Sequence, residues 1–332
     1  MANGSGNCMQ LAIYGAGSTG CYLGGLLQLC GHDVSLICRQ RIRDSIVEAG
    51  GITLTDYTGQ NEKVMPTGLI TQLAGETFDA VFVTLKCHQL EAAVADLKQL
   101  AEDGAELFFM QNGLDSLDAV QHQLPDGAVW QGITPFNILS LDNARFHRGT
   151  QGSFLFHQTP ITEKLAQNLS DIGFTCELQV DMKPVIYGKL LLNLNNALNA
   201  IADQPIKTQL ENHGLRKVYA AAQREWLEVA KAEGVELAQF TAVKPSWMPV
   251  VLSFPNWIFM RLAKAMLDID PLARSSMWED IQSGRKTEIE FLNEAVVKRG
   301  EILGVDVAVN RKISSLIHSL ERGETVSIDQ AF

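Results

Sequence analysis

The stretch LAIYGAGSTG, residues 11–20, decides the fold class of this chain. Residues 11–14 predict a short buried strand, and an apolar helix follows the glycine-rich turn as far as Leu29. A G-x-G-x-x-G turn between a strand and a helix is typical of dinucleotide-binding sites, because its glycines permit the tight turn, the close approach of a pyrophosphate and the packing of helix on strand. The alternative is a glycine-rich turn of another α/β fold. We expect the phosphate-binding loop to consist of Gly15, Ala16, Gly17, Ser18, Thr19 and Gly20.

Apolar strand-like runs alternate with amphipathic segments through the first half of the chain. Strands are predicted at 33–38, 79–85, 105–110, 128–133, 153–157 and 175–180, and helices at 90–100 and 162–172. From Asp181 to Leu320 nearly every segment predicts helix. Strand–helix alternation favours a parallel sheet covered on both faces. The predicted fold is therefore an α/β Rossmann-type doubly wound domain at 9–180, followed by an all-α domain at 182–332; the residues discussed below make the first the expected NADP-binding domain and the second the expected substrate and catalytic domain.

The composition excludes several function classes. The chain has 332 residues, 46% of them hydrophobic, and a net charge of −11 without a basic stripe, so nucleic-acid binding is not expected. Its six cysteines include no C-x-x-C pair, which predicts no metal site and favours buried thiols in a reducing cytoplasm. The first ten residues lack the basic region of a secretory signal, and the most apolar stretch, Met248–Met260, is too short to span a membrane.

The end of the second predicted strand indicates the type of nicotinamide cofactor. NAD-binding domains usually place an acidic residue there to hold the ribose 2′-hydroxyl. This strand instead ends Ile37-Cys38-Arg39-Gln40-Arg41, whose guanidinium groups suit a 2′-phosphate. Arg39 and Arg41 are alternatively solvated residues of the next helix. We expect NADPH, with Arg39 as the residue that selects it.

Polar residues follow two further strands. Lys86 ends DAVFVTLK, and Asn112 follows LFFM in the turn Gln111-Asn112-Gly113. Ligands bind at the carboxyl edge of open α/β sheets. Either residue alone is an ordinary turn residue, but as a pair at one edge they predict a binding site.

The helix YGKLLLNLNNALNAIA, residues 187–202, is apolar on all sides except for one polar stripe. At about 100° per residue, Lys189, Asn193 and Asn196 lie within about 60° of one another. A buried lysine is costly unless it is paired or neutralised, and a lowered pKa makes it a proton donor. The alternative is a hydrogen-bond network between helices, with the lysine reaching towards water.

A second polar segment reads ARSSMWEDIQSGRKTEIEFLNEAVVKRG, residues 273–300, and predicts one long helix. On such a helix Ser276 and Asp280 share a face, and Glu288 lies within about 120° of it. Acidic residues on a long helix are alternatively solvated.

Together these motifs resemble the ketopantoate reductase (2-dehydropantoate 2-reductase) family, over almost the whole chain from Leu11 to Leu320. The resemblance is carried by GAGSTG, TLKCHQ, QNG, KLLLNLNNALNA and, most specifically, SSMWEDIQSGRKTEIEFLN. It implies NADPH-dependent reduction of 2-dehydropantoate to pantoate, in pantothenate and coenzyme A biosynthesis.

The resemblance also implies a role for each residue. Lys189 would be the proton donor, supported by Glu288, which also contacts the cofactor ribose. Lys86 and Asn112 would contact both cofactor and substrate. The substrate would be bound by Lys86, Asn112, Lys189, Asn193, Asn196, Ser276 and Asp280.

Two positions depart from the family pattern. The family spaces its two helix asparagines four residues apart, whereas here the second is Asn195 or Asn196; the helical face favours Asn196. Glu294 stands where the family usually has glycine.

Two other functions remain compatible with these motifs. One is reduction of a different small 2-oxo acid, which would use the same residues. The other is a non-catalytic NADPH sensor, which the presence of both Lys189 and Glu288 disfavours. The stretch Met248–Met260, with Trp247, is expected to form a homodimer interface; a lid over the cleft and plain domain core are the alternatives.

Overall fold

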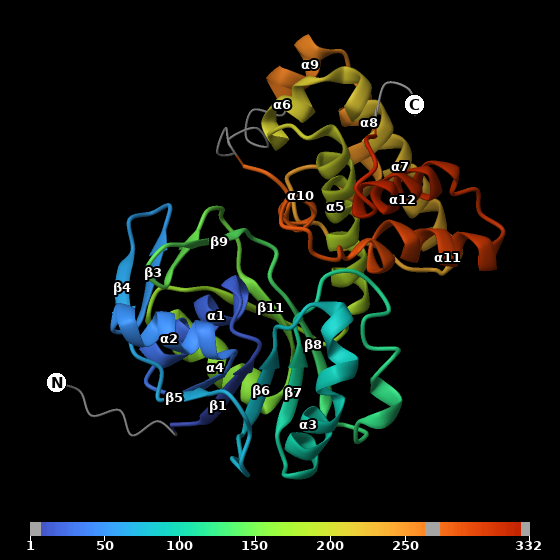
Figure 1. Ribbon diagram of the computed structural model, residues 1–332. Helices are drawn as coiled ribbons and strands as arrows, with labels where there is room; N and C mark the ends of the chain where they lie inside the picture. The colour runs from blue at the N-terminus through green and yellow to red at the C-terminus, as the bar shows by residue number, and fades with distance from the viewer. Residues whose placement is uncertain (1–7, 263–272, 327–332) are drawn as a thin grey trace. The chain divides into compact units, whose positions relative to one another are not determined.

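The computed structural model describes residues 8–262 and 273–326, and the chain forms two compact units (Figure 1). Within the described residues, the α/β unit comprises the chain up to Gln111 and Leu117–Met182. The helical unit comprises Asn112–Ser116 and the chain from Lys183 onward. An α/β unit with a largely parallel sheet and an all-helical second unit confirm the predicted fold class. Residues 1–7, which belong to the segment examined for a secretory signal, and residues 263–272, which were expected to be helical, lie outside the described residues.

The main sheet of the α/β unit has eight strands in the order β12-β11-β8-β7-β6-β1-β2-β5. Its first six strands along the chain pair in parallel, but β11 is antiparallel to β8, so the sheet is mixed rather than parallel throughout. The strands are β1 (Gln10–Tyr14), β2 (Asp33–Ile37), β5 (Gly68–Ile70), β6 (Ala80–Val83), β7 (Glu106–Phe109), β8 (Val129–Ile133), β11 (Phe154–His157) and β12 (Cys176–Gln179).

A separate apolar core covers each face of this sheet. On one face β-strand residues such as Phe82 and Phe108 pack with α1 (Ser18–Leu29), α2 (Gln40–Ala49) and α4 (Pro160–Asp171). On the other face Val81 and Phe109 pack with α3 (Leu90–Glu102). Helices on both faces are what the buried, β-branched and aromatic strands require (Figure 1).

A second sheet of four strands was not predicted from the sequence. It has the order β4-β3-β10-β9, and helix α1 packs against it. The strands are β3 (Ile52–Asp56), β4 (Asn61–Val64), β9 (Ile138–Leu141) and β10 (Arg145–Arg148). Because β3 and β10 lie about ninety residues apart along the chain, no local pattern joins them.

A buried ion pair fixes the pairing of β3 with β10. Asp56 and Arg148 are register partners, and Arg148 Nη2 lies 2.9 Å from Asp56 Oδ2, with both side chains almost fully buried. The guanidinium also stacks on the ring of Phe174, 4.7 Å from its centroid. Although burial alone would raise it, hydrogen bonds from Thr58, Gln60 and Arg148 lower the pKa of Asp56 to about 2.

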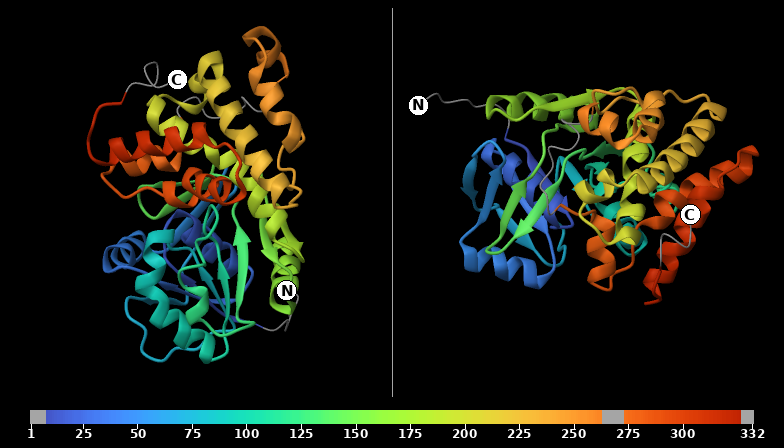
Figure 2. Two further views of the ribbon diagram at one scale, coloured as in Figure 1. Left: turned by 90° about the vertical axis from the view of Figure 1, so that its right-hand side faces the viewer. Right: turned by 90° about the horizontal axis from the view of Figure 1, so that it is seen from above.

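In the helical unit, α5 is packed against α7, α10 and α12, and no strand occurs in its described part (Figures 1 and 2). None of the described helices combines the length and apolarity that a membrane span needs. The helices are α5 (Lys183–Ala202), α6 (Ile206–Glu211), α7 (His213–Ala232), α8 (Met248–Ser253), α9 (Asn256–Leu262), α10 (Ser276–Gln282), α11 (Asn293–Leu303) and α12 (Ala308–Glu321).

The prediction of a single long helix over residues 273–300 is wrong. Helix α10 ends at Gln282, Gly284 has a φ of 61°, and a short 3₁₀ turn, η4 (Ile289–Phe291), precedes α11. A left-handed glycine directly after a helix ends it, because the backbone leaves the helical conformation there. Glu288 therefore lies in the connection to η4, not on the helix that carries Ser276 and Asp280.

Asp56→Asn is expected to destabilise the α/β unit, because it leaves the buried Arg148 guanidinium without its carboxylate. Breaking a buried pair in this way costs about 3–5 kcal/mol at neutral pH. The pKa of Asp56 is lower in the folded protein than in the unfolded chain, so its contribution is complete above about pH 4 and is lost towards about pH 2. Urea unfolding across this pH range should show that loss in the wild type but not in the variant. The exposed Asp103→Asn is the control, and equal midpoints for all three proteins would refute the role of the pair.

Candidate functional site

The glycine-rich loop leaves open space at the N-terminus of α1. Gly15 has a φ of 107°, and its N–H donates to the carbonyl of Ile37 at 3.1 Å. Gly17 caps α1, and apart from its chain neighbours a Cβ built on it meets no atom of the described residues within 4 Å. A Cβ on Gly20, in contrast, would lie 2.3 Å from the carbonyl oxygen of Gly15. The open cradle over Gly17 and the close packing at Gly20 fit a bound phosphate and the packing of α1 on β1.

The remaining loop residues and the two arginines after β2 differ in exposure. Ala16 is buried, whereas Ser18 and Thr19 are half-buried at the first turn of α1. Arg39 is the N-cap of α2, two residues after the end of β2, and both Arg39 and Arg41 are exposed. An exposed guanidinium at this position is available to an anionic ligand.

Gln111 ties together the ends of the two strands that precede Lys86 and Asn112. Its Nε2 donates to the carbonyls of Val83 and Leu85, at 2.9 Å each. Lys86 is half-buried, and its backbone N–H donates to Gln89 Oε1 at 3.3 Å. Lys86 and Asn112 were predicted from the sequence as site residues, but Gln111, which joins the two strand ends, was not.

The segment Asn112–Ser116 belongs to the helical unit rather than to the α/β unit that surrounds it in the sequence. Leu114 N–H donates to the carbonyl of Phe291 at 2.9 Å, and a Cβ on Gly113 would lie only 2.1 Å from that oxygen. Asp115 has a φ of 62°, which is uncommon for a residue other than glycine. Both of its carboxylate oxygens accept hydrogen bonds from Arg299 on α11. Asn112, at the start of this segment, is thereby fixed to the helical unit.

Arg299 also links this segment towards helix α5. Its Nε lies 3.3 Å from Oε1 of Glu233, and the other oxygen of Glu233 accepts from the hydroxyl of Tyr187 on α5. This network was not predicted from the sequence, because Asp115 and Arg299 are 184 residues apart and neither belongs to a recognisable motif.

The less buried face of α5 carries the predicted polar stripe. Lys189, Asn193 and Asn196 are half-buried, whereas Leu190 and Leu194 between them are fully buried. Removal of water from the Lys189 ammonium group lowers its pKa to about 7, and the charge of Glu288 opposes this shift. A lysine with a pKa near neutrality can donate a proton and recover it from water.

The asparagines of α5 divide into two groups. Asn195 Oδ1 accepts from Gln209, and Asn199 binds Gln204, Gln209 and the backbone N–H of Ser275, so both form a buried network within the bundle. The side-chain nitrogen of Asn193 is buried and has no hydrogen-bond partner in the described part of the chain. The helical face had favoured Asn196 over Asn195 without excluding Asn195, and Asn195 is engaged in this structural network.

Ser276 and Asp280 occupy one short helix but differ in exposure. Ser276 is exposed at the first residue of α10, whereas Asp280 is 3% exposed. The carboxylate of Asp280 accepts from Arg285 Nε at 2.9 Å, an ion pair that sequence analysis did not foresee. The neighbouring Ser275, not Ser276, caps α10 and donates to the carbonyl of Asn196.

Each unit thus gathers a different set of the predicted site residues. The α/β unit contains the glycine-rich loop, Arg39 and Lys86. The helical unit contains Asn112, Lys189, Asn193, Asn196, Ser276, Asp280 and Glu288. Within the helical unit Lys189 and Glu288 interact electrostatically.

Comparison with known families covers both units. The model of the ketopantoate reductase PanE/ApbA family matches residues 11–160, and the model of its C-terminal domain matches residues 181–321. The chain belongs to the ketopantoate reductase family. This confirms the family predicted from the motifs, a family of oxidoreductases that act on 2-dehydropantoate.

Curated relatives and solved structures agree over nearly the full length. The chain is 26% identical to 2-dehydropantoate 2-reductase of Archaeoglobus fulgidus, over 95% of this chain and 98% of that protein. The crystal structure of a PanE/ApbA family ketopantoate reductase from Ralstonia eutropha JMP134 is 27% identical, with a TM-score of 0.79 over 95% of this chain and 99% of that one. A D-mandelate dehydrogenase solved with NADH and anilino(oxo)acetate is 23% identical, with a TM-score of 0.78 over 96% of this chain and 100% of that one, and shares the fold.

Proposed function

We propose that this protein reduces 2-dehydropantoate to pantoate with NADPH, as a step in pantothenate and coenzyme A biosynthesis. The observation that carries the proposal is Lys189, a lysine with a pKa near neutrality on the polar face of a buried helix, under the influence of Glu288. The names of the relatives support the substrate. The six cysteines, all in the described residues and all free thiols, suit an enzyme of the reducing cytoplasm.

The α/β unit offers the phosphate-binding loop, Arg39 and Lys86 to NADPH, and the helical unit offers Asn112 and Glu288. The backbone at Gly15–Gly20 would take the pyrophosphate and Arg39 the 2′-phosphate, while Lys86, Asn112 and Glu288 would contact the nicotinamide half. When bound, NADPH supplies the hydride that reduces the ketone carbon.

The helical unit would orient the 2-oxo acid and supply the proton. Lys189 donates its Nζ proton to the oxygen of the carbonyl group as that oxygen gains negative charge, and Glu288 stabilises the protonated lysine beforehand. Asn193, whose buried amide nitrogen has no partner among the described residues, and Asn196 would hydrogen-bond the substrate. Ser276 would bind the carboxylate, and Asp280 would be a further substrate-binding residue.

The cofactor proposal predicts that Arg39→Ala weakens NADPH binding selectively. Loss of one charge-assisted contact to the 2′-phosphate should raise the dissociation constant for NADPH by about 10-fold to 100-fold, while that for NADH, which lacks this phosphate, stays the same. Fluorescence titration of both cofactors measures this. Arg145→Ala, another exposed arginine of the α/β unit, is the control. Wild-type protein that binds NADH as tightly as NADPH would contradict the proposal.

The proposed acid predicts that Lys189→Ala lowers kcat with 2-dehydropantoate by about 10²–10⁴-fold and leaves NADPH affinity nearly unchanged. Only the protonated lysine is an acid, so the wild-type kcat should fall as the pH rises through about 7, and this limb should be absent from the variant. Lys189→Arg should not restore the rate, because a guanidinium does not release its proton in this range. NADPH oxidation measured against pH, over a panel of 2-oxo acids, tests both acid and substrate.

Lys183→Ala is the matched control, because Lys183 is an exposed lysine at the start of the same helix. If Lys189→Ala keeps the wild-type kcat, the stripe is only a hydrogen-bond network and Lys86 becomes the candidate acid. If another 2-oxo acid is reduced more efficiently than 2-dehydropantoate, the mechanism stands and the substrate assignment fails.

We further propose a homodimer formed through the stretch around α8 and α9. Met248, Leu252 and Phe259 are buried in the core of the helical unit, but Trp247 and Trp257 of the same stretch are 61% and 75% exposed. Val250, Met260 and Leu262 add further exposed apolar side chains. Light scattering at micromolar concentration should give twice the 36.5 kDa mass of one chain. Trp257→Glu should give the monomer mass, whereas Ile302→Glu, at an exposed site on α11, should not; a monomeric wild type would refute the proposal.

A further inference from the structure

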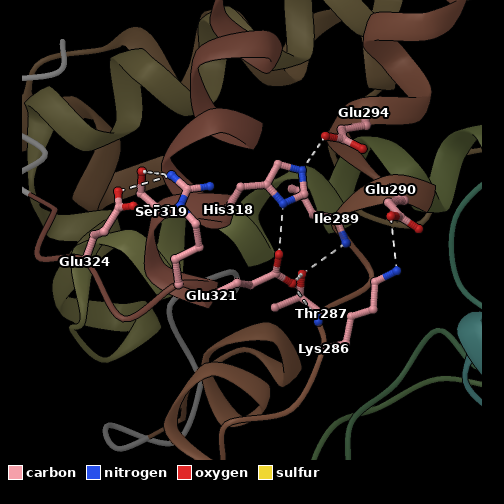
Figure 3. A network of polar contacts seen from close by, with 10 residues as sticks. Lys286, Thr287, Ile289, Glu290, Glu294, His318, Ser319, Glu321 and Glu324 are labelled. Carbon is pink, nitrogen blue, oxygen red and sulfur yellow. Dashed lines mark hydrogen bonds and ion pairs between the residues drawn. The ribbon is translucent and has the colours of Figure 1, made fainter.

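Glu288 lies in a turn whose backbone is fixed by its neighbour Thr287. The hydroxyl of Thr287 donates to Oε1 of Glu321 at 2.8 Å and accepts from the N–H of Ile289 at 3.3 Å. The N–H of Thr287 donates to the same oxygen of Glu321 at 3.0 Å (Figure 3). The residues before and after Glu288 are therefore both linked, through one buried threonine, to a carboxylate at the end of α12.

The carboxylate of Glu321 is in turn held by a histidine between two acids. Nδ1 of His318 lies 2.8 Å from Oε2 of Glu321, and its Nε2 lies 2.6 Å from Oε1 of Glu294 on α11 (Figure 3). A neutral imidazole has one N–H and can donate only one of these bonds, whereas the protonated ring donates both. Glu294, the residue that replaces the usual family glycine, thus binds the far side of this ring.

The charges around His318 favour the protonated ring. Burial lowers its pKa, but the hydrogen bonds and charges of Glu294 and Glu321 outweigh this effect and raise it. In the same turn as Thr287, Lys286 pairs with Glu290, and at the end of α12 Arg322 pairs with Glu324. Because this pKa is raised, His318 donates to both Glu321 and Glu294 below the ordinary histidine pKa. One of these two hydrogen bonds is lost as the pH rises through the raised value.

We propose that Glu321 is a positioning residue for the reaction: through Thr287 it fixes the backbone on both sides of Glu288, and the His318–Glu294 pair holds it there. The inference rests on the proposed function, in which Glu288 stabilises protonated Lys189. Glu321, His318 and Glu294 need not touch substrate or cofactor for this role.

The consequence concerns the protonation of Lys189. Desolvation lowers the pKa of this lysine and the charge of Glu288 raises it, so a displaced Glu288 leaves desolvation less opposed. Loss of Glu321 should therefore lower the pKa of Lys189 further. The fall of kcat at alkaline pH should then begin at a lower pH.

The test compares Glu321→Ala with Glu321→Gln. The alanine variant should move the alkaline limb about half a pH unit towards lower pH, which lowers kcat at pH 7 by about twofold. The glutamine variant should restore both, because its amide oxygen still accepts from Thr287 and its amide N–H can donate to a neutral His318 ring. Glu324→Ala is the matched control, because Glu324 lies near the same helix end but its carboxylate binds Arg322 and Ser319 rather than Thr287.

A direct titration separates this inference from the proposed function. The pKa of Lys189 is measured without substrate by NMR of ¹³C-labelled lysine, with the signal assigned from its absence in Lys189→Ala. Thr287→Val, which removes only the hydroxyl, gives a second measurement if Glu321→Ala does not fold, and should shift the pKa in the same direction by less. An unmoved Lys189 pKa in folded Glu321→Ala or Thr287→Val overturns the positioning role. A wild type that reduces no 2-oxo acid, with the titration still shifted, overturns the proposed function alone.

Discussion

The arrangement of the helical unit depends on the cost of placing an ammonium group on a helix that is otherwise apolar. Leu190, Leu191 and Leu194 bury α5 in the bundle, and Lys189 must share that environment. Desolvation disfavours its charge, and the carboxylate of Glu288 compensates only in part, so the pKa settles near 7. A lysine on a solvent-exposed surface would stay charged, and one in a fully apolar core would be neutral. A pKa near 7 requires partial desolvation together with a nearby carboxylate.

That balance requires the position of Glu288 to be well defined, and the surrounding residues provide this. Thr287 and Ile289 are hydrogen-bonded on either side of it, and Phe291, at the end of the same turn, accepts from Leu114. Arg299 then holds the segment that contains Leu114 through Asp115. Contacts between parts of the chain that are far apart in sequence thus converge on one short turn.

The sequence predicted the elements that repeat locally and missed those that depend on distant partners. The strands at 11–14, 33–38 and 105–110 and the polar face of α5 follow from periodicity and from a glycine motif. The second sheet did not, because β3 and β10 are short and pair across a long stretch of chain. The break at Gly284 was also missed, because acidic and apolar residues on either side of it continue a helical pattern. Arg299 and Glu321 gave no signal, since their partners Asp115 and Thr287 lie 184 and 34 residues away.

The membership of Asn112–Ser116 in the helical unit has a consequence for dissecting the protein. A fragment cut near residue 182 would carry this segment away from the unit that it completes. Leu114, buried in the helical core, would be exposed on the first fragment, and Arg299 in the second would lose the carboxylate of Asp115 and keep only that of Glu233. The helical unit is therefore not formed by one continuous segment of the chain. A split or permuted version of the chain would keep both cores intact only if the five residues were supplied to the second half as a graft or by reassociation of the pieces.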